Sequence, residues 1–241
     1  MHRQRIERVW ILVAALTVAC APIAEPPPPE KQPVPAEFPE AFYQSAHARG
    51  EPVFRIEPEG SEAVIHVYRG GSLERLGHDH LVASRDVRGY VLLKYTPVEA
   101  RADLYVPFDS LTVDEPDRRA QAGLPPLPPD LDNSGTRRNM LGQVLEAQRY
   151  PFALIHVGDL ERDEQGLALQ ATLTLHGVTR AVRIPAEIDI SEGELRVNGR
   201  FSLQQTDFGI TPFSVLSGKL QVQDRIDLRF RIRARRVPAL H

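Results

Sequence analysis

The sequence has one cysteine, a short apolar run and no excess of basic charge, and each of these shortages excludes a class of protein. Cys20 is the only cysteine among 241 residues, so an intrachain disulfide framework is excluded. The apolar stretch Val9–Val18 is too short to cross a bilayer as a helix. Lys and Arg number 29 against 32 Asp and Glu. Because no basic excess is present to neutralise phosphates, we expect no nucleic-acid partner.

Motifs of catalysis are also missing from the sequence. It contains no G-x-S-x-G elbow and no phosphate-binding loop. The triplet Asp207-Phe208-Gly209 stands without the glycine-rich loop and HRD element that accompany it in kinases. No pair of carboxylates has a spacing that establishes proximity. We therefore expect a protein that is not an enzyme.

A strict period of two runs through residues 167–190. Leu or Ala occupies every second position from Leu167 to Leu175. From Val182 to Ile190, apolar side chains again occupy every second position, here the even-numbered ones. Side chains alternate across a strand, so each segment has one dry face and one wet face. Gly177 supplies backbone freedom between them, which predicts an antiparallel hairpin.

The same alternation predicts strands elsewhere in the chain. The further segments are Ala63–Tyr68, Val87–Lys94, Ala102–Phe108, Phe152–Leu160, Leu195–Leu203 and Ile226–Ala234. About eight strands are enough to close a barrel whose interior either packs solidly or holds one small ligand. The predicted fold is therefore all-β, a single antiparallel barrel with one short helix.

Two segments depart from the strand pattern. Residues 114–132 are acidic and rich in proline, which predicts a long loop without secondary structure. The following residues 135–148 have helical periodicity, with Asn133 or Ser134 as the cap. We expect this helix to cover one end of the barrel.

The N-terminal part has the pattern of an exported protein. Arg3, Arg5 and Arg8 precede the apolar run, and residues 1–20 are predicted to be an export signal. The string LTVAC that ends at Cys20 resembles the lipobox of bacterial lipoproteins, which implies lipidation of Cys20 and anchoring on the periplasmic side of a bacterial membrane. The alternative is an ordinary cleavage site that releases a soluble periplasmic protein. Residues 21–50 are predicted to be a proline-rich tether, and residues 53–237 the barrel domain.

Three strings carry a resemblance to a known family. LTLHGVTRAV, QTDFGI and NMLGQVLEAQRYPFALIHV resemble the YceI-like family of secreted bacterial proteins. The resemblance implies a lipocalin-like barrel whose apolar lumen binds a long isoprenoid, such as a quinone tail or a polyprenyl lipid. Together with the apolar faces of the strands, it assigns lipid contact to Val91, Leu93, Leu104, Val106, Ile155, Leu169, Leu173, Val182, Ile184, Val197, Phe201, Phe208 and Phe230.

The string LGHDHL departs from the common family pattern. His78 and His80 are two residues apart, so they lie on one side of an extended segment and can meet one metal ion, with His176 or His156 as further ligands. Ordinary hydrogen-bonded histidines near the barrel mouth are the alternative. Our hypothesis from the sequence is that the pair holds the polar end of a lipid, because that group would otherwise be buried without a partner.

Three functions remain open at this point. The first is a membrane-tethered protein that holds an isoprenoid or quinone-type lipid in its barrel. The second is a metal-binding or redox-related protein that uses His78 and His80. The third is a non-catalytic scaffold with a solid barrel.

Overall fold

A computed structural model describes residues 34–93, 100–128, 133–164, 166–191 and 193–238. Within these residues eight antiparallel strands form a closed ring, because the last strand pairs with the first. Their order around the ring is β1 (Val53–Ile56), β4 (Arg88–Leu92), β5 (Arg101–Pro107), β7 (Phe152–Asp163), β8 (Gly166–Leu175), β9 (Val178–Ser191), β10 (Glu194–Gln204) and β12 (Leu220–Arg236). The expected all-β barrel is confirmed.

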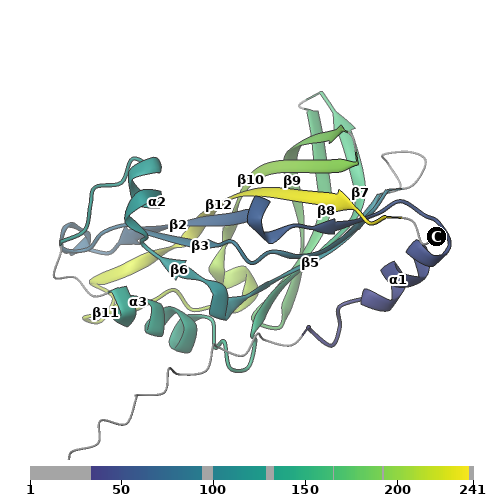
Figure 1. The fold of residues 1–241 in the computed structure, drawn as a ribbon. Coiled ribbons are helices and arrows are strands. Elements are labelled where there is room, and N and C mark those ends of the chain that lie inside the picture. Colours follow the sequence, from purple (N-terminus) through teal and green to yellow (C-terminus); the bar gives the residue numbers. More distant parts are fainter. Residues whose placement is uncertain (1–33, 94–99, 129–132, 165, 192, 239–241) are drawn as a thin grey trace, which may run out of the picture. The chain divides into compact units, whose positions relative to one another are not determined.

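The long strand β12 closes the ring and also carries an extension. One of its edges pairs with β10 from Arg225 to Arg235. The other edge pairs first with β2 (Glu62–Gly70) and then, at Ala234–Arg236, with β1. The strands β3 (His80–Ser84) and β6 (Thr112–Val113) continue outward from β2, as Figure 1 shows. The short strand β11 (Ser214–Val215) pairs with the beginning of β12.

Three short α-helices in the described part of the chain pack on this sheet. Helix α1 (Glu40–Ala48) buries Tyr43 and Ala46 against Val53 and Leu92. Helix α2 (Pro116–Gln121) lies over one face of the β2–β3 extension, where Ala122 and Leu124 pack. Helix α3 (Asn133–Asn139) continues into a π-helical turn (Met140–Val144) that packs on the other face and on one end of the barrel.

The hairpin predicted from the strict alternation is present. Strands β8 and β9 pair from Ala168↔Pro185 to Leu175↔Val178. The two turn residues between them, His176 and Gly177, have φ angles of 52° and 75°. Glycine adopts the left-handed region at no steric cost, so Gly177 suits this turn.

Three expectations differ from the structure. The predicted strand Ala63–Tyr68 forms as β2, but it lies outside the ring, and the four-residue strand β1 takes the eighth place. The segment 114–132, expected to be an unstructured loop, contains α2. The segment 21–50, expected to be a tether, contains α1, because Tyr43 and Ala46 have an apolar surface to pack on.

Among the described residues, no helix is long and apolar enough to cross a membrane. The predicted export signal, Cys20 and the first part of the tether lie outside the described residues.

Candidate functional site

The interior of the ring is apolar on every strand. One buried cluster takes side chains from all eight strands, including Phe54, Val91, Leu195 and Ile232. A second cluster at one end contains Leu173 and Phe208. Ile155, Val182 and Phe201 contact both clusters, so the two form one continuous apolar interior, which we call the barrel interior.

The residues predicted to contact lipid all belong to the barrel interior. Six of them are buried: Val91, Val106, Leu169, Leu173, Ile184 and Phe208. Seven keep part of their surface accessible: Leu93, Leu104, Ile155, Val182, Val197, Phe201 and Phe230. Apolar side chains that face the inside of a ring and stay partly accessible are a surface that an apolar ligand can cover.

A glycine leaves room for one of these rings. Gly199 on β10 lies opposite Phe230 on β12. A Cβ atom at Gly199 would collide with the Phe230 ring. The centroid of the Phe201 ring lies 6.5 Å from the centroid of the Phe230 ring, in an edge-to-face arrangement. The absence of a side chain at Gly199 therefore sets where the Phe230 ring lies.

A histidine cluster lies on the strand extension. His78 precedes β3, His80 begins it, and their ring centroids are 4.5 Å apart. Asp114 follows β6, which pairs with β3 through Val82↔Val113. Ligand atoms of His78, His80 and Asp114 lie within 4.8 Å of one another. The pair predicted from the sequence thus gains a carboxylate 34 residues further along the chain.

Asp114 is fully buried and has charged partners. It accepts hydrogen bonds from His80 Nδ1 at 2.6 Å, from the Arg119 guanidinium at 2.6 Å and from the Leu81 backbone N–H at 2.9 Å. Burial alone would raise the pKa of Asp114, but these hydrogen bonds outweigh it and hold the pKa below its usual value. The carboxylate is therefore ionised and accepts a hydrogen bond from the N–H group at His80 Nδ1.

His78 is in a different environment from His80. Its Nε2 atom is buried and has no hydrogen-bond partner within the described part of the chain. Burial, followed by the neighbouring His80, lowers the pKa of the His78 imidazole. Both effects favour the neutral form of the His78 ring.

The two other histidines that the sequence suggested as ligands lie elsewhere. His176, in the β8–β9 turn, has its Nε2 atom 3.2 Å from a Glu146 carboxylate oxygen and its ring 4.6 Å from that of Tyr150. His156, on β7, contacts Asp103 through Nδ1 at 2.7 Å. Neither joins the cluster of His78, His80 and Asp114. The prediction that His176 could complete this site is corrected, since its ring lies beside Glu146 and Tyr150.

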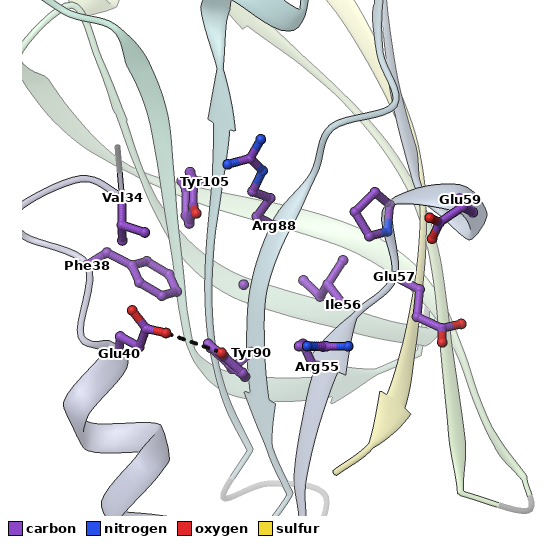
Figure 2. Close-up of a pocket in the computed structure, with 12 residues that line it drawn as sticks. Val34, Phe38, Glu40, Arg55, Ile56, Glu57, Glu59, Arg88, Tyr90 and Tyr105 are labelled. Atoms are coloured by element: carbon purple, nitrogen blue, oxygen red, sulfur yellow. Dashed lines mark hydrogen bonds between the residues drawn. The ribbon is translucent and has the colours of Figure 1, made fainter. Parts of the chain in front are cut away.

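A pocket of about 370 Å³ lies on the outside of β1, β4 and β5. Figure 2 shows Val34, Phe38 and Glu40 on one side of it and Glu57 and Glu59 on the other. Arg55, Arg88, Tyr90 and Tyr105 also line it, so it is much more polar than the barrel interior. Ile56 belongs to both the pocket and the barrel interior.

An antiparallel ring of eight strands with an apolar interior is the architecture of lipocalin-like barrels. Residues 54–234 match the YceI-like domain, and the chain belongs to that family.

Two solved structures share the fold. BcnA of Burkholderia cenocepacia is 13% identical, with a TM-score of 0.53 over 74% of this chain and 98% of that chain. A polyisoprenoid-binding domain from Saccharophagus degradans, implicated in plant cell wall breakdown, is 11% identical, with a TM-score of 0.53 over 76% and 98% of the two chains. No curated protein matches the sequence.

Proposed function

We propose that this protein binds the chain of an isoprenoid lipid in the barrel interior. The observation that carries the proposal is the partly accessible apolar surface of Leu104, Val182, Val197 and Phe230 inside a closed ring of strands. Covering about ten isoprenoid carbons at ~0.8 kcal/mol each gives ~8 kcal/mol before ordering costs. Quinone tails and polyprenyl lipids both present such a chain.

The comparisons support the same ligand class. The Saccharophagus degradans domain, which shares the fold, is described as polyisoprenoid-binding. The match to the YceI-like domain covers residues 54–234, which include all but the first residue of β1 and all but the last two of β12. Apolar recognition of this kind requires shape and apolar surface and no catalytic group. We propose a binding role on this basis.

We further propose that the protein works at a membrane. The string LTVAC ending at Cys20 supports lipidation, and anchoring on the periplasmic side would place the barrel close to its source of lipid. The proline-rich segment after Cys20 supports a spacer between the anchor and the barrel.

A charge placed inside the barrel tests the proposal. Val197→Asp buries a carboxylate on the barrel interior, and we expect the purified variant to lose its bound lipid, because an unpaired charge is strongly disfavoured in an apolar site. Asn198→Asp is the matched control, since it adds the same charge one residue further on the exposed face of β10. Solvent extraction and mass spectrometry of both variants measure the lipid. Equal retention by folded Val197→Asp and Asn198→Asp proteins would contradict the proposal and favour a scaffold with a solid barrel.

A further inference from the structure

His78, His80 and Asp114 form a group of potential metal ligands that lies outside the barrel interior. His78 and His80 lie before and at the start of β3, and Asp114 is held beside them by backbone pairing. The Asp114 N–H donates to the Leu81 carbonyl at 2.8 Å, while the Leu81 N–H donates to Asp114 Oδ1 at 2.9 Å. The carboxylate is therefore fixed relative to β3 by two hydrogen bonds to the same residue.

Asp114 determines which nitrogen of His80 is available. An ionised carboxylate only accepts hydrogen bonds, so at 2.6 Å from Asp114 Oδ2 the His80 Nδ1 atom carries a proton. In the neutral ring, Nε2 then keeps its lone pair. A carboxylate behind a histidine is the usual support of a metal-binding imidazole, because it fixes both the tautomer and the orientation of the ring.

His78 supplies the second nitrogen. Its Nε2 atom is buried without a hydrogen-bond partner in the described residues, which costs free energy unless another group satisfies it. The ring centroids of His78 and His80 lie 4.5 Å apart, and the two ring planes meet at an angle of 65°. Nitrogen ligands bind zinc at about 2.0–2.1 Å, so two nitrogens on one ion lie at most about 4 Å apart. One ligand atom from each of His78, His80 and Asp114 lies within 4.8 Å of the other two, so the three side chains form a compact group of potential metal ligands.

Charge and donor type restrict the ion. The charge of Asp114 is balanced by the buried Arg119 guanidinium at 2.6 Å, so Asp114 serves as the support of His80 and the two imidazoles are the ligands. Imidazole suits zinc and copper, whereas magnesium and calcium require oxygen ligands. We propose that His78 and His80 bind one Zn²⁺ or Cu²⁺ ion through imidazole nitrogens, with Asp114 orienting His80 and water completing the coordination. This site is separate from the lipid-binding function proposed above, and it replaces the hypothesis that the two imidazoles hold a lipid headgroup.

Metal titration of the full chain tests the proposal. The protein is purified without a polyhistidine tag, treated with a chelator and titrated calorimetrically with Zn²⁺, Cu²⁺ and, as the hard-cation control, Mg²⁺. We expect one equivalent of Zn²⁺ or Cu²⁺ to bind and Mg²⁺ not to bind. His78→Ala and His80→Ala each remove one ligand and should abolish saturable binding. Asp114→Asn keeps both ligands but removes the support of His80, and it should lower the metal affinity by about tenfold to a hundredfold.

The control variant is His156→Gln. His156 also forms a carboxylate–histidine pair, with Asp103 at 2.7 Å, but it lies outside the cluster. It should bind metal like the unaltered protein. Asparagine tolerates the left-handed backbone at position 114, where φ is 54°. Asp114→Asn also leaves the buried Arg119 guanidinium without its counter-charge, so the two histidine variants, which keep this ion pair, carry the main test. Circular dichroism confirms that each variant is folded.

Two results would overturn the metal site. The first is the absence of saturable Zn²⁺ or Cu²⁺ binding, and the second is equal binding by the His78→Ala/His80→Ala double variant. If the double variant instead loses bound lipid while the unaltered protein binds no metal, the imidazoles hold a headgroup. That outcome rejects the metal site and leaves the lipid-binding function standing.

Discussion

The Arg119 guanidinium lies 2.6 Å from Asp114 Oδ1, and neither side chain is more than 2% exposed. Arg119 also donates to the carbonyl oxygens of Asp79 at 2.7 Å and Pro125 at 2.9 Å. A single side chain thus joins the segment before β3, the end of β6 and the segment after α2. This buried network keeps α2 on the strand extension and supports the histidine cluster.

Arg119→Met should strongly destabilise the fold. It leaves the Asp114 carboxylate buried without its counter-charge, and breaking a buried ion pair in this way costs about 3–5 kcal/mol. Urea denaturation measures the change in the free energy of unfolding. Arg49→Met is the control, because Arg49 pairs with Glu51 at the surface, where such pairs contribute at most about 1 kcal/mol. A similar small loss for both variants would show that the buried network does not hold this part of the fold.

The docking of α1 should weaken in acid. Tyr43 donates to Asp103 at 2.6 Å, and Arg101 and His156 also contact this buried carboxylate. Burial would raise the pKa of Asp103, but the hydrogen bonds outweigh it and lower the pKa. The unfolded state therefore binds more protons, so the stabilisation is fully present above the ordinary carboxyl pKa of about 3.9 and declines as the pH falls below it.

Tyr43→Phe tests this linkage. It removes a hydrogen bond to a charged group, worth about 1.5–3 kcal/mol at neutral pH, and brings the pKa of Asp103 closer to its ordinary value. Unfolding measured from pH 7 to pH 3 should show the difference between variant and unaltered protein shrinking at the acid end. A difference that stays constant with pH would remove Asp103 from this account.

Cys20→Ser should release the protein from the membrane. Stable anchoring requires more than one acyl chain, and a lipidated N-terminal cysteine provides this. Fractionation of cells that express the full chain should place the unaltered protein with membranes and the variant in the soluble periplasm. The same soluble distribution for both would instead support ordinary cleavage after export.

The barrel was predictable because its strands repeat a local pattern. In β8, β9, β10 and β12, apolar and polar side chains alternate along consecutive residues, so the fold class and the inward-facing side chains follow from the sequence alone. Strand β1 was missed because a segment of four residues is too short to show the alternation clearly. Strand β2 alternates like a barrel strand, but its place outside the ring is decided by the part of β12 with which it pairs. On the same edge of β12, β2 pairs along Gln221–Arg231 and β1 along Ala234–Arg236.

The histidine cluster was predictable only in part. The spacing of His78 and His80 is local, whereas Asp114 reaches them through the pairing of β3 with β6. The proline-rich composition after Asp114 suggested a loop without structure. The buried Arg119 that fixes α2 there has no signal in the sequence, because an arginine in such a segment is normally exposed.

Native extraction tests the central claim most directly. The unaltered protein is purified from the membranes or periplasm of its own source without added lipid, and its solvent extract is analysed by mass spectrometry against the protein concentration. The account predicts an isoprenoid lipid at close to one molecule per protein, held by the barrel interior. Repeated recovery of no lipid, together with a crystal structure in which side chains fill the interior, would contradict it.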